Sequence, residues 1–223
     1  VPHLSTEKIA KILPKMDASQ IAKVTPHLTA KQMKDALTTT DEEQTKILLQ
    51  NLNPSQVMQI LPSLDEKTFT KTIRNMESEK ISKILPQMDA RNLIRSIKVL
   101  PEPEKYLSQL KPDKLTNIVN EIDDSLLAKT FPLLDEEKTK KLIESLPTER
   151  LLSVAEKSPT QFERIVSSVD SKRLIDMAKR ADVPTIRKIL SFREESLPVI
   201  VRNLPDGTLM NLMPELSAVE TIE

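Results

Sequence analysis

Cysteine and tryptophan are absent from this sequence, and glycine and tyrosine occur once each in 223 residues. Without cysteine the chain has no disulfides and no thiolate ligands for a metal, which favours a cytoplasmic location but leaves an exported one open. The scarcity of glycine argues against strands joined by tight hairpins and against glycine-rich loops that bind phosphate groups. We therefore expect neither a sheet fold nor a phosphate-binding loop.

Long apolar runs and an excess of one charge are absent as well. No stretch approaches the roughly 18 apolar residues that a membrane helix needs, so we expect no membrane insertion by this chain. Val1 opens no recognisable signal peptide. The 33 basic and 33 acidic residues cancel. This balance argues against binding to nucleic acid, which requires a basic surface.

The feature that organises the sequence is a repeat of 12 residues. The stretch Glu79 to Ala90, EKISKILPQMDA, matches Glu7 to Ala18, EKIAKILPKMDA, which lies 72 residues earlier, or six times 12. Each unit has a polar or acidic residue at position 1, apolar residues at positions 5, 8 and 9, often proline at position 10, and a large apolar residue at position 12. Position 12 recurs without a slip from residue 4 to residue 100, with Thr40 as its one polar member. The run Thr38 to Thr40 predicts either an exposed turn or a helix shifted by one residue.

Each repeat is typical of one short helix followed by a turn. Positions 5, 8 and 9 share one face of a helix, and that face is apolar. Proline at position 10 cannot continue the helix, so we expect each helix to end near position 9. A short polar side chain at position 1 can cap the unpaired N–H groups of the first helical turn. Nine repeats carry such a residue: Asp17, Asp41, Asn53, Asp65, Asp89, Asp123, Asp135, Asp170 and Asp182.

The number of repeats predicts the fold. Counting from Ser5 to Pro205 gives 18 repeats, so we expect an all-α protein of about 18 short helices. Such helices are shorter than the roughly 12 to 15 residues that a stable isolated helix needs, so each must pack on its neighbours. Stacking predicts an α-solenoid in which two repeats form a helical hairpin of 24 residues. We expect one repeat domain over residues 1–223, with a hinge or sub-domain boundary at 100–112 and a tail at 217–223.

Four stretches show the repeat most clearly: Lys8 to Ala18, Val57 to Glu66, Lys80 to Ala90 and Leu127 to Glu137. Their acidic N-cap, apolar positions 5, 8 and 9, Leu-Pro pair and leucine at position 12 resemble the cytosolic N domain of MgtE-type magnesium transporters. The pattern is similar, though less regular, in superhelical segments of the flagellar motor switch protein FliG. The resemblance implies a right-handed superhelix of short helices. It also implies a regulatory role, in which acidic side chains help to bind magnesium at the junction with a following module, although no residue here matches those ligands one to one.

Residues that catalysis or metal binding requires are sparse. We interpret the two histidines, His3 and His27, as surface or turn residues, and no set of nucleophile, base and metal ligands is recognisable. Carboxylate clusters could hold a hard cation such as Mg²⁺ or Ca²⁺, or could simply stabilise helix starts, where negative charge is favoured. We favour the second interpretation and predict no catalytic, cofactor or metal site. The clusters are Asp41 to Glu43, Asp123-Asp124 and Asp135 to Glu137.

Basic residues recur at position 7, on the side of the helix away from positions 5, 8 and 9. We call this series the basic ladder. It is a candidate surface for binding an acidic protein segment. The alternative is a solvated face, with lysine near the helix end where the dipole favours positive charge. The candidate partner-binding residues are Lys11, Lys23, Lys71, Lys83 and Arg95.

These observations favour a non-catalytic protein-protein interaction scaffold whose partner carries an acidic segment. The alternative is a regulatory, Mg²⁺-sensing cytosolic domain of a transporter, which the family resemblance suggests. A third hypothesis, an RNA-binding helical repeat, is poor because aromatic residues for stacking are scarce and the net charge is zero. The sequence identifies neither the partner nor the oligomeric state.

Overall fold

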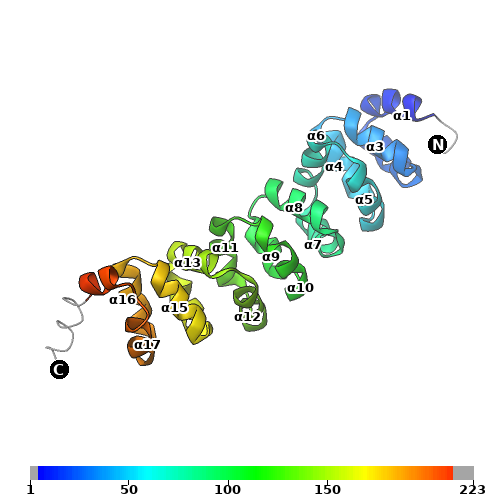
Figure 1. Ribbon diagram of the computed structural model, residues 1–223. Helices are drawn as coiled ribbons and strands as arrows, with labels where there is room; N and C mark the ends of the chain where they lie inside the picture. Colours follow the sequence, from blue (N-terminus) through cyan, green and yellow to red (C-terminus); the bar gives the residue numbers. More distant parts are fainter. Residues whose placement is uncertain (1–4, 213–223) are drawn as a thin grey trace. The chain divides into compact units, whose positions relative to one another are not determined.

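The computed structural model describes residues 5–212, and every regular element in that range is a helix (Figure 1). The all-α prediction is therefore confirmed. These residues form 17 α-helices and seven 3-10 helices, and residues 206–212 are helical as well. The right-handed superhelix stays a prediction. His3, Leu4 and the predicted tail at 217–223 lie outside the described residues.

Contacts divide the chain into two units, unit 1 (Val1–Leu110) and unit 2 (Lys111–Glu223), which we describe separately. The predicted hinge at 100–112 stays a prediction. The helices of unit 1 are α1 (Thr6–Ile12), η1 (Leu13–Lys15), α2 (Ala18–Val24), η2 (Thr25–His27), α3 (Ala30–Thr39), α4 (Glu42–Asn51), α5 (Pro54–Ile60), η3 (Leu61–Ser63), α6 (Glu66–Arg74), α7 (Ser78–Ile84), η4 (Leu85–Gln87), α8 (Ala90–Val99) and α9 (Pro103–Gln109). Those of unit 2 are α10 (Pro112–Ile118), η5 (Val119–Glu121), α11 (Asp124–Thr130), η6 (Phe131–Leu133), α12 (Glu136–Ser145), α13 (Thr148–Lys157), α14 (Pro159–Ser168), α15 (Ser171–Arg180), α16 (Val183–Phe192), η7 (Glu194–Ser196) and α17 (Leu197–Val201).

Side chains at position 1 begin the helices, as predicted. All nine Asp and Asn residues at this position accept a hydrogen bond from the backbone N–H three residues later, at 2.8–2.9 Å. At Asp17 and Asn53 the glutamine three residues later also accepts a bond from the cap backbone, which completes a capping box. Helix starts are therefore satisfied by residues that are close in the sequence.

Proline at position 10 ends α1, α2, α5, α7 and α11, and a three-residue 3-10 helix follows each of them. Helix α3 lacks this proline and continues to Thr39. Thr38 and Thr39 are exposed, but Thr40 is buried, and its hydroxyl donates to Ala36 O at 2.8 Å. Thr29 caps α3 in register, so the helix is not shifted. The threonine run is the exposed end of a longer helix, followed by a buried position 12.

Positions 5, 8 and 9 form the core, as Ile81, Ile84 and Leu85 illustrate in α7 and η4. Within unit 1 the helices pack in two rows. Helices α1, α3, α5 and α7 contact one another in turn, and so do α2, α4, α6 and α8 (Figure 1). In unit 2 the rows are α10, α12, α14, α16 and α11, α13, α15, α17. Most helices thus pack mainly on the helix two places away in the chain, whereas α14 packs most closely on the adjacent α13.

Basic side chains from another helix satisfy the carbonyl ends of several helices. The last carbonyl groups of a helix have no partner within it and form the negative end of its dipole. In six cases a lysine or arginine of an α-helix donates to carbonyl oxygens at positions 9 or 12 of the repeat whose helix lies three places earlier, and Arg193, which precedes η7 and α17, donates in the same way to Val166 O and Val169 O of the α14 repeat. We call this contact a cross-helix cap. The pairs are Lys71 on α6 with α3, Lys80 on α7 with α4, Arg95 on α8 with α5, Arg150 on α13 with α10, Arg164 on α14 with α11, and Arg173 on α15 with α12.

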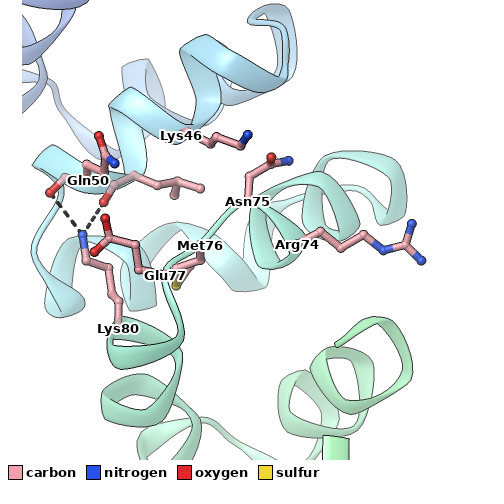
Figure 2. A pocket seen from close by; sticks show the side chains of 8 residues that line it. Lys46, Gln50, Arg74, Asn75, Met76, Glu77 and Lys80 are labelled. Carbon is pink, nitrogen blue, oxygen red and sulfur yellow. Dashed lines mark hydrogen bonds between the residues drawn. The ribbon is translucent and has the colours of Figure 1, made fainter. Parts of the chain in front are cut away.

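Lys80 makes three such contacts. Its ammonium group donates to the carbonyl oxygens of Leu49 and Leu52, the second at 2.7 Å, and lies 3.3 Å from Gln50 O (Figure 2). Lys71 donates to Thr40 O at 2.6 Å. Because each row contains helices two places apart, a contact between helices three places apart joins the two rows of a unit.

The first prediction concerns the core. Replacing Ile84 by alanine should lower the free energy of unfolding by about 2 to 5 kcal/mol, because the side chain is fully buried and leaves a cavity. The neighbouring Lys83→Ala should cost less than about 0.5 kcal/mol, since its ion pair with Glu79 is exposed. Urea unfolding of both variants checks this. Equal losses would mean that the assigned helix face is wrong.

The second prediction concerns the cross-helix caps. Lys80→Met keeps the length of the side chain but removes its charge, and should lower the free energy of unfolding by about 1 to 3 kcal/mol, because hydrogen bonds from charged groups contribute about that much. Lys80→Arg should restore most of the loss, and Lys83→Met on the same helix is the matched control. Thermal unfolding measures all three. If Lys80→Met and Lys83→Met are equally stable, the carbonyl contacts contribute nothing.

Candidate interaction surface

The structure separates the basic ladder into two groups. Lys11, Lys23 and Lys83 are exposed, as predicted. Lys71 and Arg95 are not: both side chains are partly buried and form cross-helix caps. The prediction that position 7 is a solvent-facing row is wrong for these two residues, because the carbonyl end of another helix lies within reach of the long side chain.

The contacts of Arg95 explain its structural role. Its guanidinium carbon lies 3.9 Å from the centre of the Phe69 ring, and its Nη2 forms an ion pair with Glu66 at 2.9 Å. It also donates to Leu64 O at 3.3 Å. A stacked, ion-paired and hydrogen-bonded arginine holds α8 against α6 and the end of α5, and its charge is already neutralised.

Two adjoining clefts in unit 1 are lined by five cations. The Lys71 cleft, of about 400 Å³, is lined by residues of α3, α4 and α6, and among them are Glu42, Asp65, Lys67 and Lys71. The Lys80 cleft, of about 270 Å³, is lined by residues of α4, the end of α6 and the start of α7; its charged residues are Lys46, Arg74, Glu77 and Lys80. Arg74 and Asn75 line both clefts.

Figure 2 shows the Lys80 cleft from close by. The Glu77 carboxylate lies beside the Lys80 ammonium, the Lys46 and Asn75 side chains approach each other, and Arg74 extends away from Lys80. Arg74 donates one long hydrogen bond, of 3.4 Å, from Nε to Val99 O. The guanidinium of Arg74 therefore remains exposed at the surface.

The clefts carry an excess of positive charge. They hold five cations (Lys46, Lys67, Lys71, Arg74, Lys80) and three carboxylates (Glu42, Asp65, Glu77), which leaves a difference of +2. Sequence reasoning missed Lys46, Lys67 and Arg74, because these residues occupy positions 6, 3 and 10 of their repeats and follow no period. Position 10 did not single out Arg74 either, because Thr38, Gln50 and Lys98 stand at the same position of other repeats.

Glu77 precedes α7 without capping it. Each N-cap residue of α1 to α6 and of α8 accepts a hydrogen bond from the helix it precedes, whereas Glu77 at α7 and Glu102 at α9 make no such bond. The Glu77 side chain is exposed and lines the Lys80 cleft.

Partial burial changes the pKa of Lys71 and of Lys80, the two lysines that form cross-helix caps. Burial lowers the pKa of Lys71, and the Asp41 carboxylate opposes that shift. Burial likewise lowers the pKa of Lys80, against the opposing charge of Glu77. Hydrogen bonds from Thr68 lower the pKa of Asp65, which keeps that carboxylate ionised.

The acidic clusters that could hold a cation lie at helix starts. Within the described part of the chain, no three His, Asp or Glu side chains converge in a way that could hold a metal ion. Asp41, Asp123 and Asp135 each cap a helix. His27 is exposed in η2.

None of the helices between residues 5 and 212 is both long enough and apolar enough to span a bilayer.

Comparison with known proteins gives one match. The family model of the MgtE intracellular N domain matches residues 31–110, a range that lies in unit 1 and contains every residue lining the two clefts. No curated protein and no solved structure gives a significant match to the chain. The resemblance predicted from the repeat is therefore confirmed: residues 31–110 are similar to the MgtE intracellular N domain.

Proposed function

We propose that this chain is a non-catalytic interaction module in which unit 1 binds an acidic segment of a partner protein. The observation that carries this proposal is the gathering of five cations around two adjoining clefts that share Arg74 and Asn75. A concave surface with an excess of one charge attracts a segment of the opposite charge and orients it.

The cations of the clefts have different roles in this proposal. Lys71 and Lys80 are already bound to carbonyl oxygens, so they contribute a positive field more than free donors. Lys67 and Arg74 are exposed, and Lys46 is held only by a loose contact of 3.8 Å to Glu43. These three side chains can therefore turn towards carboxylates of a partner. Arginine suits this task because its planar fork can bind both oxygens of a carboxylate.

The third prediction tests the clefts with matched charge reversals. Lys67→Glu combined with Arg74→Glu should weaken binding of a fluorescein-labelled polyglutamate peptide by at least about tenfold, since two favourable charges become repulsive. The control is Lys31→Glu combined with Arg91→Glu, which makes the same change in net charge at exposed positions of unit 1 outside both clefts. Fluorescence anisotropy measures both.

The salt dependence of binding gives a second measure. Wild-type affinity should fall as salt rises, and the cleft variant should lose most of that dependence. Circular dichroism confirms that each variant remains helical. If the cleft and control variants weaken binding equally, only the total charge matters, and the clefts are not the binding surface.

A second candidate function rests on the family match at residues 31–110. A domain that resembles the intracellular N domain of MgtE is a candidate regulatory domain of a magnesium transporter. In that role the chain is expected to bind Mg²⁺ in its folded state, together with the module that follows it.

The fourth prediction tests this candidate. Magnesium chloride at up to tens of millimolar should raise the Tm by several degrees, because a ligand that binds only the folded state stabilises it by about 2.7 kcal/mol at a hundred times its Kd. Sodium chloride of the same ionic strength is the control. Identical melting curves in the two salts would rule out the hypothesis that this chain alone senses Mg²⁺. They would not affect the proposal that the clefts bind an acidic segment.

A further inference from the structure

Arg74 and Asn75 line both clefts of unit 1, at the point where α6 ends. Asn75 is held in place, because its Nδ2 donates to Lys71 O at 2.8 Å. Arg74 is exposed, and its Nε donates the long bond of 3.4 Å to Val99 O. Its Nη1 and Nη2 form no hydrogen bond or ion pair with the part of the chain that the structure describes. Arg74 can therefore contribute to binding in either cleft.

Each cleft adds one exposed cation that the other lacks. Lys67 lines only the Lys71 cleft, and Lys46 lines only the Lys80 cleft. The remaining cations, Lys71 and Lys80, are bound to carbonyl oxygens. The cations that can reach a partner are thus one from each cleft and Arg74, which both clefts share.

The spacing of these cations suits a peptide segment. Lys67 and Arg74 both lie on α6, nearly two helical turns apart, so they project from the same side of the helix. Their separation along the axis is about 10 Å, which an extended segment spans with about three residues. Lys46 lies on α4, which packs on α6, and Figure 2 shows its side chain next to that of Asn75. A segment that passes from Lys67 over Arg74 can therefore continue to Lys46.

Neither cleft is strongly basic by itself. The Lys71 cleft has three cations and two carboxylates, and the Lys80 cleft has three cations and one carboxylate, with Arg74 counted in both. An exposed ion pair contributes little, so a short acidic ligand held in one cleft binds weakly. A segment that reaches both clefts forms its second set of contacts as an intramolecular step, at a high effective concentration.

We propose that a single acidic segment occupies both clefts at once, with one end at Lys67, its middle at Arg74 and its other end at Lys46. This inference rests on the proposed function and adds the path and the length of the bound segment. The segment runs along α6 and then crosses to α4, so it is longer than the roughly three residues that separate Lys67 from Arg74. Arg74 suits the middle position because its planar guanidinium can bind both oxygens of a carboxylate.

The experiment is isothermal titration calorimetry of the full chain at low salt with polyglutamate of about ten residues, which is long enough to reach both clefts. One peptide should bind per chain. Lys46→Glu and Lys67→Glu should each weaken binding by about fivefold or more without changing the stoichiometry, since each removes the contact at one end of the same segment. Circular dichroism checks that both variants remain helical.

The matched control is Lys31→Glu, which makes the same change in net charge at an exposed position of α3 outside both clefts. It should change the affinity by less than about twofold, because a single distant surface charge is largely screened.

Two results would overturn the proposal. Two peptides bound per wild-type chain, with each cleft variant removing one of them, would mean that the clefts bind separate segments. A loss of affinity in only one of the two cleft variants would confine the segment to one cleft. Neither result would contradict the proposed function, which fails if cleft and control variants weaken binding equally.

Discussion

Unpaired carbonyl groups at the ends of short helices constrain this structure more than any other feature. A helix leaves four N–H groups and four C=O groups without partners inside it. In α7, which has seven residues, these groups are most of the backbone. Leaving such a group buried and unpaired costs about 1 to 3 kcal/mol. Helix ends that are buried in the core therefore need partners outside the helix.

The N–H groups at the start of a helix and the C=O groups at its end find their partners at very different distances in the sequence. N–H groups are capped by a side chain three residues away, as Asp89 caps Asn92 N at 2.8 Å. Carbonyl groups are partly satisfied by 3-10 turns after proline and partly by cross-helix caps, in which Lys80 reaches back to Leu52. Local capping fixes where helices begin, whereas the distant caps join the two rows of a unit.

This difference decides what could be predicted from the sequence. Helix starts, helix ends and core positions follow from patterns within one repeat, so Asp89, Ile84 and Leu85 were assigned correctly. Cross-helix caps could not be found in this way. Lys71 and Lys83 occupy the same position 7, yet Lys71 caps α3 and Lys83 stays exposed. In α7 the carbonyl end of α4 is capped by Lys80, at position 4, and Lys83 pairs with Glu79 on its own helix.

The candidate site lies at the junction between α6 and α7. Arg74 stands at position 10, Asn75 ends α6 without a 3-10 helix, and Glu77 precedes α7 without capping it. All three residues line the Lys80 cleft, and Arg74 and Asn75 also line the Lys71 cleft. The sequence does not single out this junction, because the α3, α4 and α8 repeats also lack proline at position 10 and Glu102 also precedes a helix without capping it. Nor does it reveal that Lys46 and Lys67, on two different helices, line the same clefts.

The cross-helix caps use both kinds of basic side chain. Unit 2 uses arginine at Arg150, Arg164 and Arg173, and the planar guanidinium of Arg150 reaches Val119 O and Ile122 O with separate nitrogens. Unit 1 uses lysine at Lys71 and Lys80 and arginine at Arg95. The lysine ammonium is a compact point charge, whereas the guanidinium is a planar fork. The two clefts lie at the lysine caps, so the cations that hold the carbonyl ends of α3 and α4 also contribute to the positive charge of the clefts.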